Sequence, residues 1–492
     1  MMKNWKKIIA LLIIFVVFLT AFIFLKNNLN KPDDGVEDPL PTDIASSDEI
    51  KLIEIEQDDI LRIVLAREEG EIVLTKEERH VETLETNEDG TTKKVTEKKM
   101  IWVNPDFNVD NDLAEDMVSA AASVMTKRLI DENPGDLTIY GLDNSLVTTF
   151  ISKDGKEVSI EIGNLTPKQD SYYVKRLDKP EVYTIDSYKG RTLRYGKLDL
   201  MNKNLYGTEA LSDEDVTSLT FIRAGEEVFA AEKKGSSDWV IISPIPEREA
   251  KTSGLSKFLN WVSTFRVREF IEENPSDLSL YGLDSPKYVF DYTLNGKPYR
   301  VLLGNKNESE YYGKLEGNDT VFTVDAAYLN FIDLLLKDVV SLYAYMPFIF
   351  DVEKLVIEID GRTDVLLINE SQEEGSTPEF YFNGQKIEGD EQESRFRKYY
   401  QAAVGIMGDK IDLESVPSGE AKVRLTYTMK KPDPDKIVKV ELIPTNDGYG
   451  YFIMLNDNYT GLVIGERKLN DDSDTGIRRA YKNLAEVLSK TK

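Results

Sequence analysis

The sequence predicts an α+β protein in which an N-terminal transmembrane helix precedes three tandem α+β repeats, each a small, mostly antiparallel sheet with one or two packed helices. Three observations lead to this fold class. Residues 273–286 repeat, almost letter for letter, a segment at residues 132–143. Alternating apolar segments follow both copies in the same order, which indicates strands. A run of 18 apolar residues, 8–25, lies near the N-terminus.

The apolar run just reaches the length needed to cross a bilayer. Lysines precede it and acidic residues follow it, so the positive-inside rule places residues 1–7 in the cytoplasm and the bulk of the chain outside. The alternative is a cleaved signal peptide, but the run is longer than a usual signal core and residues 20–25 offer no pair of small residues for cleavage. We therefore expect a single-pass protein of the cell membrane, held by a signal anchor.

Composition sets the limits on the remaining chain. A length of 492 residues with 41% hydrophobic content is enough for more than one core and suggests about three domains. The net charge of -27 argues against a nucleic-acid partner, which would need a basic face. The chain has no cysteine, which excludes disulfides, thiolate metal sites and a lipoprotein anchor.

Proline, glycine and acidic residues punctuate the chain into segments. After the anchor, residues 26–48 are acidic, contain prolines and have little to bury, which predicts an extended stalk. We expect the first repeat at residues 49–205 and the second at residues 213–347. Residues 348–492 keep the order of elements but lack the repeated segment, as a terminal capping copy does, so we expect a degenerate third repeat.

Each repeated segment contains Asn-Pro, then a turn that ends at glycine, then an aspartate that leads into a strand. We interpret this pattern as a helix stop followed by a helix-to-sheet corner. Asp154-Gly155 and Asn295-Gly296 predict hairpins farther along each copy, so that four strands follow each corner. The signature residues are Trp102, Asn133, Pro134, Tyr140, Gly141, Leu142, Asp143, Gly163, Tyr172 and Tyr173 in the first copy, and Trp239, Asn274, Pro275, Tyr281, Gly282, Leu283, Asp284, Gly304, Tyr311 and Tyr312 in the second.

Apolar spacing of three and four residues predicts the helices. In the first copy, a helix after Pro105 is expected to lead directly into the Asn-Pro corner, and residues 76–99 form a charged insertion expected to be a long hairpin or loop. The remaining helices are expected near residues 255–265, 328–342, 392–407 and 477–488.

Motifs that carry chemistry are missing from the sequence. His80 is the only histidine, so one chain cannot assemble a histidine-based triad or zinc cluster. There is no phosphate-binding glycine loop, no nucleophile elbow and no His-Glu-x-x-His. Residues 470–476 resemble a calcium loop, but no register places both the required glycine and the required glutamate, so a helix-entry loop is the better interpretation. We therefore predict no catalytic residue, no metal site, no cofactor and no enzymatic activity.

Two functional interpretations stay open beside this one. The many carboxylates could include a pair that hydrolyses glycans, although the sequence does not single out any pair. The repeated tyrosines could form a ligand-binding surface. Half-buried packing on a sheet explains such tyrosines equally simply and is the interpretation we favour.

The second copy resembles the bacterial "domain of unknown function 4340" family. The residues that carry the resemblance are Trp239, Asn274-Pro275, the run Tyr281 to Pro286, Leu303-Gly304-Asn305 and Tyr311-Tyr312. The first copy matches as well, except that Asn144-Ser145 replaces the Ser-Pro after the aspartate. The resemblance covers Ile60 to Asp338 and reaches the third copy only through the order of elements.

The resemblance implies an envelope protein with one membrane span. Some members of the family are similar to auxiliary components of ABC-2-type exporters of the kind linked to gliding motility, and the family provides no catalytic residue to transfer. We therefore expect an accessory subunit of such an exporter, with the permease and ATPase subunits as separate chains. The alternatives are a free-standing envelope scaffold or ligand-binding protein and, less favoured, a glycan hydrolase.

Overall fold

The computed structural model describes residues 50–490 except 69, 88–91, 144–145, 208–210, 236–237, 370–377, 431–435 and 471–475. The expected membrane anchor and stalk, and most of the loop at residues 470–476, lie outside the described residues. Within the described part of the chain, no helix is both long and apolar enough to cross a membrane. The predicted anchor thus remains a prediction from the sequence.

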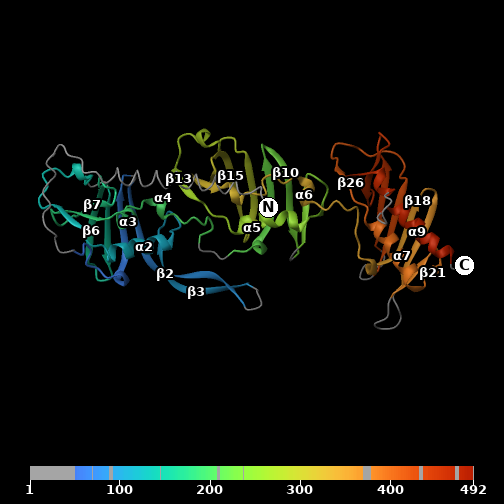
Figure 1. Cartoon of the computed structure of the whole chain (residues 1–492), viewed down its shortest axis with the longest axis horizontal. Helices are drawn as coiled ribbons and strands as arrows, with labels where there is room; N and C mark the ends of the chain where they lie inside the picture. Colours follow the sequence, from blue (N-terminus) through green and yellow to red (C-terminus); the bar gives the residue numbers. More distant parts are fainter. Residues whose placement is uncertain are drawn as a thin grey trace, which may run out of the picture.

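Figure 1 shows three units in a row along the long axis of the molecule, in chain order. Each unit contains one antiparallel sheet: unit 1 has eight strands, and units 2 and 3 have nine each. The fold is therefore α+β with tandem repeats, as predicted. The sheets are larger than the small sheets expected, because strands before and after each corner join one sheet.

Unit 1 contains the strands β1 to β8 and three helices. The elements are β1 (Ile60–Arg67), β2 (Gly70–Thr86), β3 (Thr92–Val103), α2 (Asn111–Ala122), β4 (Arg128–Asp131), β5 (Val147–Ser152), β6 (Glu157–Leu165), β7 (Ser171–Arg176), β8 (Val182–Asp186), α3 (Ser187–Leu193) and α4 (Lys197–Leu200), with short 3-10 turns η1 (Gln57–Asp59) and η2 (Thr138–Tyr140). The charged insertion is a hairpin of β2 and β3 that projects from the unit (Figure 1).

Unit 2 repeats this order with β9 to β17. The elements are η3 (Asp213–Asp215), β9 (Val216–Arg223), β10 (Glu226–Lys234), β11 (Asp238–Ser243), β12 (Arg248–Glu249), α5 (Thr252–Ser263), β13 (Glu269–Glu273), η4 (Leu278–Tyr281), β14 (Tyr288–Leu294), β15 (Lys297–Asn307), β16 (Glu310–Leu315), β17 (Thr320–Asp325), η5 (Ala326–Tyr328) and α6 (Leu336–Val339). Asn295 and Gly296 both have positive φ and form the tight hairpin between β14 and β15.

Unit 3 contains β18 to β26. The elements are η6 (Ile349–Asp351), β18 (Val352–Ile359), β19 (Arg362–Asn369), β20 (Glu379–Phe382), β21 (Gln385–Lys386), α7 (Gly389–Val404), β22 (Lys410–Ile411), β23 (Val423–Met429), β24 (Ile437–Pro444), β25 (Gly450–Leu455), β26 (Asn458–Gly465), α8 (Glu466–Leu469) and α9 (Ile477–Ser489). The strand orders β12-β11-β10-β9-β14-β15-β16-β17-β13 and β21-β20-β19-β18-β23-β24-β25-β26-β22 coincide position by position. The third segment therefore has the topology of the second, although it lacks the repeated corner.

The interpretation of Asn-Pro as a helix stop is wrong. A short edge strand, β4 in unit 1 and β13 in unit 2, separates the helix from Asn-Pro, and it pairs with the last long strand, β8 or β17. Asn133-Pro134 and Asn274-Pro275 therefore end a strand, which suits a residue that cannot donate to a β-ladder. The corner joins an edge strand to a central strand of the same sheet.

The expected helix over residues 328–342 is also wrong. Only η5 and the four-residue α6 form there. Val340 makes a β-bridge with Ala250, and the Val339 carbonyl accepts a hydrogen bond from the Lys251 amide at 2.7 Å. These pairings commit the backbone to an extended path, which overrides the helical spacing of the apolar residues.

The cores follow the same plan in each unit. One long helix, α2, α5 or α7, lies against one face of the sheet and buries its apolar side. The buried residues of unit 1 form one cluster, and those of units 2 and 3 form a second, continuous cluster. Phe107 packs against both clusters, so the cores of units 1 and 2 meet at that side chain.

The chain enters every unit in the same way. A single β-bridge joins the incoming segment to the residue three positions after the long helix, and the three bridges are Lys51 to Met125, Asn204 to Arg266 and Tyr343 to Met407. The repeated bridge fixes each unit against the segment that leads into it.

Candidate functional site

The repeated signature forms an interlocked corner. A Cβ atom on Gly163 would overlap the carbonyl oxygen of Tyr140, and a Cβ on Gly304 would overlap that of Tyr281 in the same way. Both glycines stand at register shifts in the sheet, between β6 and β7 or between β15 and β16. The signature thus brings a turn onto the bulged strand so closely that only glycine fits.

The second half of the lock is the glycine of the turn. Gly141 and Gly282 both have φ of 67°, a left-handed conformation that favours glycine. A side chain on Gly141 would meet Asn164, and one on Gly282 would meet Asn305. Leu142 and Leu283, the next residues, are buried.

The tyrosines brace this corner. The rings of Tyr140 and Tyr173 lie 5.1 Å apart, and those of Tyr281 and Tyr312 lie 5.0 Å apart. The Tyr281 hydroxyl donates to Glu272, and this hydrogen bond raises the pKa of Tyr281 to about 12. These contacts give the tyrosines a structural role, while the less favoured alternative, that they bind a ligand, stays untested.

The first tyrosine of each pair, Tyr172 or Tyr311, has different partners from the second. Tyr172 lies against Gly190 and stacks with the Arg194 guanidinium at 5.2 Å. Tyr311 packs edge-on against Tyr288 at 5.7 Å.

The two tryptophans occupy equivalent strands but differ in their partners. Asn111 accepts a hydrogen bond from the Trp102 amide at 2.6 Å, and Trp102 Nε1 donates to Glu115 at 2.9 Å. In unit 2 the Trp239 carbonyl accepts from the backbone of Ala250, next to β12. In unit 1 the Asn111 side chain therefore bonds the edge that β12 covers in unit 2.

The remaining signature residues shape the turns. The backbone amide of Asn133 donates to the Asp131 carboxylate. Asn274 adopts φ of 49°, and its backbone amide donates to the Asp319 carbonyl. Asp143 and Asp284 directly follow the buried leucines.

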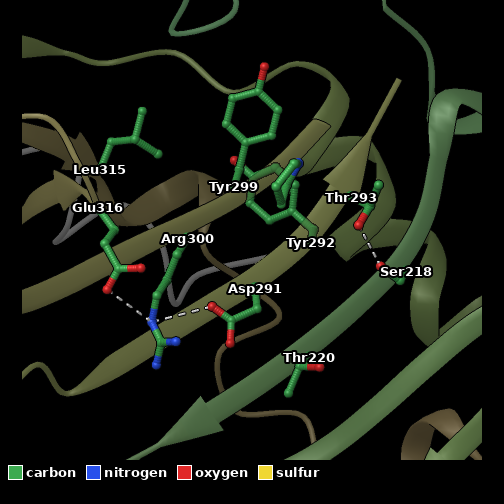
Figure 2. A pocket seen from close by; sticks show the side chains of 10 residues that line it. Ser218, Thr220, Asp291, Tyr292, Thr293, Tyr299, Arg300, Leu315 and Glu316 are labelled. Atoms are coloured by element: carbon green, nitrogen blue, oxygen red, sulfur yellow. Dashed lines mark hydrogen bonds and ion pairs between the residues drawn. The ribbon is translucent and has the colours of Figure 1, made fainter. Parts of the chain in front are cut away.

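The best candidate site that the structure adds is a depression of about 480 Å³ on the sheet face of unit 2, shown in Figure 2. Its polar side chains are Ser218 and Thr220 from β9, Asp291 and Thr293 from β14, Arg300 from β15 and Glu316 beyond β16. Hydroxyl, carboxylate and guanidinium groups thus share one open surface.

The charges in the depression are arranged around Arg300. Its Nε lies 3.4 Å from Asp291 and 3.8 Å from Glu316. Dashed lines in Figure 2 mark both ion pairs. Asp291 Oδ1 is buried and is not aligned for a hydrogen bond with this or any other described group. Burial raises the pKa of Asp291 above its ordinary value of 3.8, although Arg300 opposes the shift.

Tyr292 and Tyr299 also border the depression. They pair across β14 and β15 next to the pair Asp291 and Arg300, so their side chains lie on the opposite, core-facing side of the sheet. Tyr292 stacks on Tyr299 at 5.6 Å, and its hydroxyl lies 2.8 Å from the hydroxyl of Tyr206. Tyr206 comes from the segment that links units 1 and 2, and it donates to the Val262 carbonyl at 2.7 Å. The site is therefore tied to the junction between units.

A second polar depression, of about 350 Å³, lies at the junction of units 1 and 2. Several asparagines line it, but Asn104, Asn202, Asn204 and Asn318 each use the side-chain oxygen to accept a nearby backbone amide. These asparagines therefore shape turns at the junction.

Metal binding finds no support in the described part of the chain, where no group of three or more His, Cys, Asp or Glu side chains could hold an ion. His80 lies exposed on β2.

The depression on unit 2 was not predicted from the sequence. The available signal was Asp291, a charged residue between the buried Phe290 and Tyr292 of a central strand. Its partners come from β9, from β15 and from the residue just beyond β16, and no local pattern connects them.

Comparison with known proteins gives one match. A family model described as "Domain of unknown function (DUF4340)" matches residues 102–286 and again residues 255–391. No curated protein and no solved structure matches the chain. The first match begins at Trp102 and the second ends in α7, so together they extend from unit 1 into unit 3.

Proposed function

Because the chain belongs to the DUF4340 family, a domain of unknown function that matches residues 102–391, we propose a function from the site and the architecture. The proposed function is that of a non-enzymatic, membrane-anchored, extracytoplasmic accessory subunit of an ABC-2-type export system. Its anchor is residues 8–25, and its permease and ATPase are separate chains.

The observation that carries the proposal is the row of three similar units joined by repeated bridges (Figure 1). A continuous core joins units 2 and 3, and Lys197 of unit 1 pairs with Glu273 of unit 2 at 2.5 Å. Such an array presents a long surface to partners, as stacked repeats commonly do.

The test is gentle solubilisation of membranes, capture of the full-length chain and identification of the proteins that accompany it. We expect a multi-span permease and an ATPase. The matched control is residues 1–48 fused to an unrelated ectodomain, which should not retain them. Capture of the same proteins by this control, or their absence from both samples, contradicts the proposal.

The orientation has its own test. Protease added to whole cells without an outer barrier should digest the chain beyond Lys26. Complete protection, with digestion only in opened cells, contradicts an extracytoplasmic ectodomain.

The depression of Figure 2 favours a second candidate, a free-standing envelope protein that binds a polyhydroxylated ligand such as a glycan. Hydroxyl and charged groups gathered on one open surface suit such ligands. Arg300→Ala should weaken glycan retention by about tenfold or more, since a charge-assisted hydrogen bond is lost. Arg424→Ala, in the sheet of unit 3, is the matched control.

A glycan hydrolase is the third candidate, and the same depression provides its carboxylates. If the purified ectodomain cleaves glycan and loses this activity in both Asp291→Asn and Glu316→Gln, the non-enzymatic proposal fails.

A further inference from the structure

The edge strands β4, β13 and β22 occupy the same place in their sheets, but only β13 and β22 follow another described unit. The preceding unit contacts the edge of unit 2 and of unit 3. The comparison of these two occupied edges with β4 indicates what unit 1 can bind.

In unit 2 the occupied edge combines an ion pair with apolar contact. Lys197 of unit 1 lies 2.5 Å from Glu273, and its ammonium also lies 5.7 Å from the ring of Phe107. Phe270, on the same edge, is buried and lines the junction with Phe107 and Thr320.

In unit 3 the contact at the same end of the edge strand is apolar. A Cβ on Gly461 of β26 would meet both Leu413, just beyond β22, and Ile245, which belongs to unit 2. Ile245 is fully buried. Each of the two junctions therefore uses a residue at or just beyond the C-terminal end of the edge strand.

Strand register identifies the equivalent residues of unit 1. Leu129 faces Tyr183 as Phe270 faces Phe322, and the same alignment places Glu132 at the position of Glu273 and Glu181 at that of Thr320. We name Leu129, Glu132 and Glu181 the β4 edge.

The β4 edge is open where its counterparts are covered. Glu132 is exposed and has no ion-pair partner in the described ranges, and Leu129 is only half-buried, whereas Phe270 is buried. Glu181 Oε2 is buried, with no hydrogen-bond partner in the same part of the chain. Two acceptor groups thus lie beside an apolar side chain, which is the arrangement that Lys197 and Phe107 fill in unit 2.

Charge indicates which occupant fits. The stalk residues of this chain that precede unit 1, 26–48, carry a net negative charge: they contain six aspartates and glutamates and two lysines. Like charges oppose their docking on Glu132 and Glu181. A cationic segment is complementary.

We propose that the β4 edge is a docking surface for a lysine- or arginine-bearing segment of a separate partner protein. The chain enters unit 1 through the bridge of Lys51 to Met125, three residues before β4, so the surface belongs to the unit nearest the predicted anchor. The inference deepens the proposed function and rests on it only in assigning the partner to the membrane.

The test uses the full-length chain in its native membrane with a photoreactive phenylalanine analogue in place of Leu129. We expect a cross-link to a basic extracytoplasmic segment of another protein. Glu132→Lys should lower its yield by roughly tenfold or more, and Glu132→Gln by less, because a charge is reversed in one variant and removed in the other. Glu157→Lys, at an exposed glutamate of the same sheet, should leave the yield unchanged.

A charge exchange completes the test. Replacing the cross-linked basic residue of the partner by glutamate should restore the yield with Glu132→Lys. Three results overturn the proposal: a cross-link to residues 27–49, a cross-link to a second copy, or a yield that Glu132→Lys does not change.

The docking surface and the proposed function can fail separately. A cross-link that Glu132→Lys weakens, but to a partner outside any export system, supports the docking surface and contradicts the proposed function. Co-purified permease without a cross-link at position 129 supports the proposed function and contradicts the docking surface.

Discussion

At the residue scale, the signature is explained by contacts between backbones. Gly163 and Gly304 let a turn approach the bulged strand, while Gly141 and Gly282 let the same turn adopt a left-handed conformation. The repeated glycines therefore reflect a steric requirement of the fold.

Gly163→Ala should destabilise unit 1 by about 2–3 kcal/mol, because the new methyl group overlaps a backbone oxygen that cannot move freely. Gly135→Ala is the matched control in the same corner, since a Cβ there meets nothing within 4 Å, and its effect should stay within about 0.5 kcal/mol. Urea unfolding measures both variants. Equal midpoints would contradict the interlocked corner.

Sequence patterns predicted a turn at this corner, because Gly141 and Gly282 act locally, but they misidentified the element before it as a helix. They did not predict the group of Asp291, Arg300 and Glu316, whose members come from separate segments of the chain and meet only in the folded sheet. The tyrosine that supports this group, Tyr206, comes from a linker that has no recognisable pattern.

At the element scale, the ion pairs of Arg478 hold the C-terminal helix α9 in addition to its apolar side. Arg478 donates to both oxygens of Asp360, at 2.8 and 2.9 Å, and to Glu466 at 2.7 Å. Hydrogen bonding to Arg478 lowers the pKa of Asp360 below its ordinary value of 3.8. Asp360 also forms the turn between β18 and β19, where it has φ of 53°.

Asp360→Asn removes the charge and keeps a residue that tolerates positive φ. Because the folded state lowers the pKa of Asp360, the contact stabilises the protein above pH 3.8 and is lost as the pH falls through the lowered pKa. The difference in unfolding free energy between wild type and variant should thus be present at pH 7 and shrink below about pH 3.8. Hydrogen exchange of α9 reports it. A difference that stays constant down to pH 3 would show that charge is not involved.

The sequence predicted some secondary-structure elements and missed others. Helices α7 and α9 and the hairpins follow from local periodicity. The edge strands β4 and β13 did not, since each is short and exists because it pairs with a strand some 50 residues later, β8 or β17. The expected helix at residues 328–342 failed for the same reason, because the bridge to Ala250 is a distant contact.

At the scale of the whole molecule, the cores divide the chain unequally. One buried cluster belongs to unit 1, whereas the other extends through units 2 and 3. Cooperative units of unfolding tend to follow such contiguous cores. The molecule should therefore behave as two cooperative blocks, although it contains three sheets.

Urea unfolding followed by hydrogen exchange should show two transitions, one for unit 1 and one shared by units 2 and 3. Trp102 reports the first transition, and Trp239 and Trp261 report the second. Gly163→Ala should shift only the first. Coincident transitions at all three tryptophans would contradict the division.

The bridge at the entrance of each unit has an evolutionary consequence. Since Lys51, Asn204 and Tyr343 make the same contact with the residue beyond the long helix, every unit contains its own attachment for the chain that arrives. Duplication of one coding segment would insert a further unit without a new kind of joint. The length of the molecule can thus change by whole units, while the first and last units keep their exposed surfaces.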